Sequence, residues 1–141
     1  MFTSLNRLQP WGAFFLRLVL GAAMIYHGYS KVIPAGGFHG GNTFAALEHH
    51  SRYVASLGFP YWLGIVSALT EFAGGILVLL GLLTRFAALL ISINMLIAVL
   101  MVNRHHGYSG SEYSLALLVI ALMLSFYGSG VCALDRRFGF A

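Results

Sequence analysis

The chain has 141 residues, of which apolar types make up 59% and charged types only 9%. A typical soluble domain is about 25% charged, and a chain this short could not bury so much apolar surface within itself in water. The composition therefore excludes an ordinary soluble domain and favours a membrane protein. The formal net charge of +4 does not indicate nucleic-acid binding, because the eight Lys and Arg residues are scattered along the chain.

The cysteine and histidine content narrows the possible chemistry. Cys132 is the single cysteine, which excludes an internal disulfide, a Cys-x-x-Cys redox pair and a cysteine-based zinc site. Two histidine pairs stand at 49–50 and 105–106. Adjacent residues on a helix point about 100° apart, and no His-x-x-x-His spacing accompanies either pair. We therefore expect no metal site.

Four apolar stretches predict membrane-spanning helices, at residues 11–33, 61–83, 86–103 and 113–131. Each is close to the roughly 20 residues that cross a hydrocarbon core. Each must be helical, because an open strand leaves its backbone groups unsatisfied in lipid. The first stretch contains three basic residues and lacks an Ala-x-Ala site, so we expect a retained helix and not a signal peptide. The sequence predicts one all-α domain over residues 1–141, an integral membrane four-helix bundle.

The connections between these stretches differ in length. The segment between the first two is long, and residues 43–57 within it carry apolar residues at helical spacing, with Glu48 and Arg52 placed to pair at i, i+4. We predict a short amphipathic helix there, lying on the membrane surface or capping the bundle. The second and third stretches form a tight hairpin, and Thr84 is the expected N-cap of the third helix.

The basic residues of the short loops predict the orientation. One side of the membrane receives Arg7, Arg85, Arg136 and Arg137, and the other receives Lys31, Arg52 and Arg104. This bias predicts that both termini are cytoplasmic. Arg17 lies inside the first helix near the same side, and we expect it to snorkel to the interface.

Glu71 is the clearest candidate for a functional residue, because an ionisable side chain at membrane depth is costly. It lies about halfway along the second helix, and Asn94 lies about halfway along the third. The tight hairpin makes these helices antiparallel neighbours, so a hydrogen bond between the two side chains is expected. A purely structural role for Glu71 is the alternative, either through such a bond or through an ion pair with Arg17 or Lys31.

Other polar residues belong to the same half of the predicted bundle. His27 and Lys31 stand four residues apart on the first helix, Glu112 opens the last helix, and Arg104 lies at the rim. Together with Glu71 and Asn94 they form the predicted ligand-binding or proton-handling set.

Several short motifs follow one another along the chain. They are Arg17-x-x-x-Gly21 leading to His27-Gly28-x-x-Lys31, Glu71-x-x-Gly74-Gly75-x-Leu77-x-x-x-Gly81-Leu82-x-Thr84-Arg85, Glu112, and Gly128-x-Gly130 before Ala133-Leu134-Asp135. In this order they resemble the DoxX family of small bacterial membrane proteins. The resemblance implies a four-helix bundle in the bacterial inner membrane. Relatives include DoxD and DoxA, the membrane-associated subunits of a thiosulfate:quinone oxidoreductase.

Three functions are compatible with these observations. The first is a quinone-linked, redox-associated membrane subunit, in which Glu71 carries protons. Its electrons would come from a partner such as a soluble oxidoreductase, because the sequence has no haem, flavin or iron–sulfur motif. The second is a non-catalytic anchor or assembly subunit for a partner complex. The third is a small-molecule carrier, which would need a homo-oligomer to form a pore. Whether the chain itself is an enzyme stays open at this point.

Overall fold

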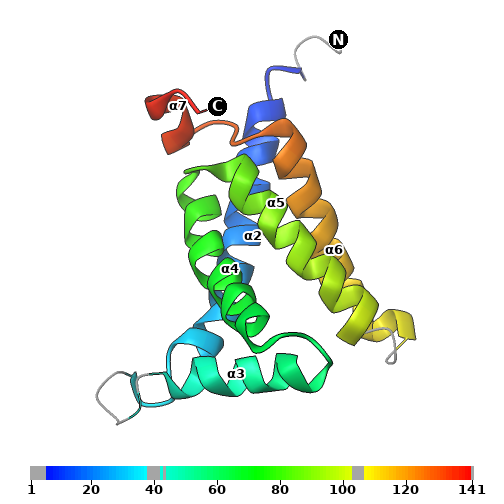
Figure 1. The fold of residues 1–141 in the computed structure, drawn as a ribbon. Helices are drawn as coiled ribbons and strands as arrows, with labels where there is room; N and C mark the ends of the chain where they lie inside the picture. Colours follow the sequence, from blue (N-terminus) through cyan, green and yellow to red (C-terminus); the bar gives the residue numbers. More distant parts are fainter. Residues whose placement is uncertain (1–5, 38–41, 43, 103–106, 141) are drawn as a thin grey trace.

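The computed structural model describes residues 6–37, 42, 44–102 and 107–140, and its helices form a membrane-sized bundle (Figure 1). The described part of the chain holds four helices long and apolar enough to cross a membrane. These are α2 (Gln9–Val32), α4 (Tyr61–Leu80), α5 (Thr84–Ile97, continued by the π-helical turn η2 over Ala98–Val102) and α6 (Gly107–Tyr127). This arrangement confirms the predicted all-α, four-helix architecture.

Two shorter helices lie at opposite ends of the bundle. Helix α3 (Ala45–Ser56) crosses one end, which we call the α3 end, and it is the amphipathic helix predicted between the first two spans (Figure 1). Helix α7 (Leu134–Phe138) lies at the other end, beside the α4–α5 turn and both chain termini, and we call this the hairpin end. The predicted Glu48–Arg52 pair is present on α3 at 3.7 Å, and it is exposed.

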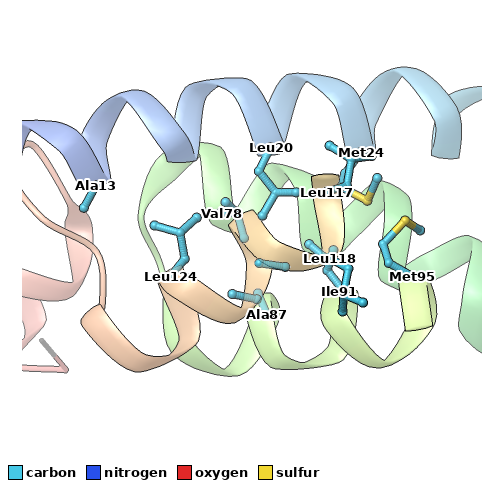
Figure 2. Packing of buried hydrophobic residues seen from close by; sticks show 12 residues of the cluster. Ala13, Leu20, Met24, Val78, Ala87, Ile91, Met95, Leu117, Leu118 and Leu124 are labelled. Atoms are coloured by element: carbon cyan, nitrogen blue, oxygen red, sulfur yellow. The ribbon is translucent and has the colours of Figure 1, made fainter. Parts of the chain in front are cut away.

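The core of the bundle is apolar and draws on all four long helices. Figure 2 shows Leu20 and Met24 of α2 meeting Val78 of α4, Ile91 of α5 and Leu124 of α6. Many large apolar side chains stay on the outer surface, for example Phe15 and Val119, which are 59% and 58% exposed. A soluble protein rarely shows so large an apolar surface, so the outside of the bundle fits contact with lipid.

The last long helix begins and ends earlier in the sequence than the predicted range of 113–131. It begins at Gly107 and ends at Tyr127. The next residue, Gly128, has φ +97°, which a right-handed helix does not allow. The apolar residues after it belong to a segment that folds back over the hairpin end.

The N-terminus of α5 is capped by a residue far along the chain and not by Thr84, so that prediction was wrong. Leu83 occupies the N-cap position. Asp135 accepts hydrogen bonds from the backbone N–H of Leu83 at 2.6 Å and of Thr84 at 2.9 Å. A carboxylate suits this position because it satisfies two helix N–H groups that lack a partner and lies at the positive end of the helix dipole.

Arg17 does not snorkel to the interface, because its side chain is fully buried at the hairpin end. The guanidinium has five N–H donors, and it makes five hydrogen bonds of 2.6–3.2 Å to backbone carbonyls. The acceptors are Val78 and Leu79 at the end of α4, and Ser129, Val131 and Cys132 in the segment after α6. Arg17 therefore fastens the C-terminal segment to the α4–α5 turn.

Two glycines allow the close approaches that shape the α3 end. A Cβ on Gly28 would lie 2.5 Å from the backbone nitrogen of Phe72, so α2 and α4 touch backbone to backbone there. A Cβ on Gly64 would overlap the Cα of Ser51, so α3 rests directly on α4. The first contact brings Lys31, one turn beyond Gly28, to the level of Glu71.

Candidate functional site

Three polar side chains from three helices meet inside the α3 end of the bundle. Glu71 of α4 is nearly fully buried, and its two oxygens have different partners. Lys31 of α2 lies 2.5 Å from Oε2, and Asn94 of α5 donates a hydrogen bond of 2.9 Å to Oε1. The hydrogen bond expected between Glu71 and Asn94 is therefore present, as is the alternative ion pair with Lys31. We call Lys31, Glu71 and Asn94 the Glu71 cluster.

A cavity of about 270 Å³ lies against the Glu71 cluster, between α3, α4 and α5. The two helices of the hairpin diverge toward the α3 end, and α3 covers the space between them (Figure 1). Apolar side chains make up most of the wall, and the polar groups gather at one part of it. The lining residues are Lys31, His50, Tyr53, Val54, Leu57, Phe59, Leu63, Val66, Ser67, Thr70, Glu71, Leu90, Ile93, Asn94, Ile97 and Ala98.

Part of the cavity wall is also part of the outer surface of the bundle. Val66 of α4 and Ile93 of α5 line the cavity and are about half exposed, as is Tyr53 of α3. Val66 and Ile93 lie within the candidate membrane spans. The cavity therefore borders the apolar outer surface of the candidate membrane spans.

The π-helical turn η2 forms the end of α5 beside this cavity. Its first residue, Ala98, lines the cavity, as does Ile97 just before it. A π-helical turn inserts an extra residue into a helix and is frequent at functional sites. The irregular turn therefore lies next to the candidate site.

His50 is a lining residue that the sequence analysis did not select. Its Nε2 is buried and has no hydrogen-bond partner within the described chain. The pKa of His50 is lowered by burial and by Lys31, against a smaller raising effect of Glu71. A pattern could have identified it, because His50 falls between Leu47 and Val54 at spacings of three and four, on the inward face of α3.

The lowered pKa of His50 predicts a pH dependence of stability. As pH falls below the usual imidazole value of 6.5, the unfolded chain takes up a proton that folded His50 resists, so the free energy of unfolding decreases. We expect His50→Gln to reduce this decrease between about pH 7 and pH 5. Thermal unfolding in detergent across that range measures it. His49, the exposed neighbour, provides the control variant His49→Gln. If His49→Gln reduces the pH-dependent loss of stability as much as His50→Gln does, burial of His50 is not its cause.

Two of the predicted site residues lie away from the Glu71 cluster, and a third lies outside the described residues. His27 is exposed, and its Nε2 lies 3.2 Å from the hydroxyl of Tyr113 across the contact between α2 and α6. Glu112 is exposed on α6 and does not line the cavity. Neither side chain lines the cavity between α3, α4 and α5. The sequence could not predict this, because it does not show how each helix is rotated about its own axis. Arg104 lies outside the described residues.

A metal centre finds no support in the described part of the chain. Within residues 6–37, 42, 44–102 and 107–140, no group of three or more His, Cys, Asp or Glu side chains could hold an ion. The histidine pair at 105–106 falls outside these ranges.

A family model described as DoxX matches residues 12–104. The chain belongs to the DoxX family. The matched region runs from the start of α2 past η2 and so includes every element that lines the cavity. In this DoxX protein, Gly28 of the first motif lies at the close contact between α2 and α4. Glu71 of the second motif is the centre of the Glu71 cluster.

Two relatives are similar over nearly the whole chain. A Bacillus subtilis (strain 168) protein named "Putative oxidoreductase CatD" is 29% identical over 132 residues, 93% of this chain and 90% of the relative. An uncharacterized protein of Haemophilus influenzae (strain ATCC 51907 / DSM 11121 / KW20 / Rd) is 30% identical over 143 residues, 96% of each chain. No solved structure matches the chain.

Proposed function

We propose that this DoxX protein is a redox-associated membrane subunit that binds a quinone in the cavity between α3, α4 and α5. One observation carries the proposal: an apolar cavity that borders the lipid-facing surface ends on buried hydrogen-bonding groups. Binding sites for small molecules are mostly apolar with a few convergent polar groups. The volume of about 270 Å³ suits a single ring-sized headgroup, and an apolar tail would leave between Val66 and Ile93.

The polar groups of the cavity suit the two carbonyls of a quinone. Lys31 and Asn94 carry N–H donors beside Glu71, and His50 of α3 brings a nitrogen without a partner to the same cavity. A buried polar atom without a partner is costly, so a carbonyl near His50 would satisfy its Nε2 in the tautomer that carries the proton on that nitrogen. Polar groups from three helices, α2, α3 and α5, would orient the ring within the cavity.

A quinone takes up two electrons and two protons when it is reduced to a quinol. The residues of this chain would serve the protons. The Glu71 carboxylate can hold a proton at Oε1 or Oε2, and Lys31, whose side chain is 27% exposed, would link that carboxylate to the outside of the bundle. The electrons would come from a partner oxidoreductase. The name of the Bacillus subtilis relative supports a redox setting.

The proposal places the protein in the bacterial inner membrane with cytoplasmic termini. Its exposed arginines support this orientation, because Arg7, Arg85, Arg136 and Arg137 all lie at the hairpin end. Cytoplasmic loops carry an excess of Lys and Arg. The cavity under α3 would then lie toward the outer side of the membrane.

Filling the cavity tests the proposal. Ala98→Phe places a ring where Ala98 lines the cavity, and Ala73→Phe makes the same change on the exposed surface of α4. We expect gently purified protein to carry extractable quinone, and Ala98→Phe to lower its amount about tenfold or more, since a steric clash costs at least about 1.4 kcal/mol. Quinone extraction and chromatography measure it. If Ala98→Phe and Ala73→Phe retain equal amounts of quinone, the cavity is not its site.

One observation favours a non-catalytic anchor as the second candidate. Both oxygens of Glu71 already have partners within the protein, and polar residues of this kind hold membrane helices together. In that case the Glu71 cluster would serve assembly alone, and quinone would be absent from the purified protein.

A further inference from the structure

A second cavity lies at the hairpin end, and it shares no lining residue with the cavity beside the Glu71 cluster. Its volume is about 190 Å³. Its walls come from the ends of three long helices and the segment after α6, and include Pro10, Arg85, Tyr127 and Ser129. Pro10 is the second residue of α2, Arg85 the second of α5, and Tyr127 the last of α6. Because three membrane-spanning helices end at this level, the cavity lies at headgroup depth.

The cavity is cationic. Arg85 and Arg136 both line it, and no Asp or Glu is among the described residues that do. The nearest carboxylate in sequence, Asp135, already accepts hydrogen bonds from two backbone N–H groups. Arg7 and Arg137 add positive charge to the same end of the protein from outside the cavity.

The arginine donors in this cavity are largely unused, in contrast to those of Arg17. Arg17 makes five hydrogen bonds with its five N–H donors. Arg85 makes one, of 3.3 Å, to the carbonyl of Tyr127, and Arg136 makes none within the described chain. The single bond holds Arg85 at the edge of the cavity and leaves most of its guanidinium fork free.

From these contacts we infer that the cavity at the hairpin end binds a phosphate-bearing anion through Arg85 and Arg136. Arginine binds phosphate oxygens with two parallel N–H groups, and basic pockets between membrane helices bind anionic lipid headgroups. The headgroup depth of the cavity makes an anionic phospholipid one source of the phosphate, and inorganic phosphate from solution is the other. This site is independent of the proposed quinone cavity.

Native mass spectrometry with two double variants tests the inference. Arg85→Gln/Arg136→Gln removes both arginines of the cavity, and Arg7→Gln/Arg137→Gln removes the same charge from the same end outside it. We expect the unaltered protein to retain phosphatidylglycerol in preference to phosphatidylcholine of the same acyl chains. We expect the first variant to lose about tenfold or more of this binding and the control to keep it, since charge-assisted hydrogen bonds from arginine to phosphate are among the strong ones.

A second measurement separates the two sources of phosphate. Thermal unfolding in nanodiscs of phosphatidylcholine alone, with and without inorganic phosphate, shows whether the free ion stabilises the protein through the same arginines. Either of two losses supports the site if it is confined to Arg85→Gln/Arg136→Gln. A loss of phosphatidylglycerol binding indicates a phospholipid as the source of the phosphate, and a loss of stabilisation by phosphate indicates the free ion. Equal losses in both double variants, or no loss in either variant in both measurements, would overturn it.

Discussion

Replacing Glu71 with glutamine is expected to lower the free energy of unfolding by about 3 kcal/mol, because it leaves a mostly buried ammonium group without its counter-ion. Lys31 is 27% exposed and Glu71 is 5% exposed by side chain, so the remaining charge could reach water only in part. Asn94 keeps a partner, since a glutamine carbonyl can accept its hydrogen bond. Thermal unfolding in detergent measures the loss.

The matched control removes both charges. In Lys31→Met/Glu71→Leu no buried charge lacks a partner, and replacing a buried ion pair with apolar residues of similar size is often neutral or stabilising. We expect the double variant to recover most of the stability lost in Glu71→Gln. A double variant less stable than the single one would show that the cluster holds the bundle together through more than the ion pair.

Replacing Arg17 with methionine is expected to lower the free energy of unfolding by more than about 3 kcal/mol, because five carbonyls lose a charged donor at once. Two of these carbonyls belong to α4, and three belong to the segment after α6. The variant should therefore also release that segment. Thermal unfolding in detergent measures the stability, and limited proteolysis between residues 128 and 138 measures the release.

Arg85→Met is the control for this experiment. Arg85 lies at the same end of the bundle, is exposed, and donates to one carbonyl. Its replacement should cost no more than about 1 kcal/mol, as expected for a surface position. If Arg17→Met and Arg85→Met have equal effects, the buried hydrogen bonds of Arg17 do not stabilise the fold as described.

The sequence predicted the features that depend on length and local period. Four apolar stretches of membrane length can only be helices in lipid, and α2, α4, α5 and α6 confirm them. The tight hairpin also fixed the relative depth of Glu71 and Asn94, so their hydrogen bond followed from local geometry. The amphipathic stripe of α3 was also predicted from local spacing. His50 lies on that stripe, but the spacing alone did not indicate that it lines a cavity.

The sequence could not predict contacts between segments that are distant along the chain. Arg17 bonds to carbonyls more than 100 residues away in the segment after α6, and Asp135 caps a helix that begins 51 residues earlier. Every residue has a backbone carbonyl, so the sequence does not indicate which carbonyls will accept the hydrogen bonds of Arg17. The same reason explains why Arg17 was expected to snorkel. The rotation of α2 and α6, which turns His27 toward Tyr113 and away from Glu71, is likewise set by packing.

The most direct test of the proposed function is the amount of quinone that co-purifies with Lys31→Met/Glu71→Leu. This variant is expected to keep most of the stability of the unaltered protein and to fold, so a change in bound quinone reports on the site and not on unfolding. The proposed site predicts that the unaltered protein carries quinone and that the double variant carries much less, because the ammonium donor of Lys31 and the carboxylate of Glu71 are gone while Asn94 and His50 remain. A folded double variant that retains the full amount of quinone would contradict it.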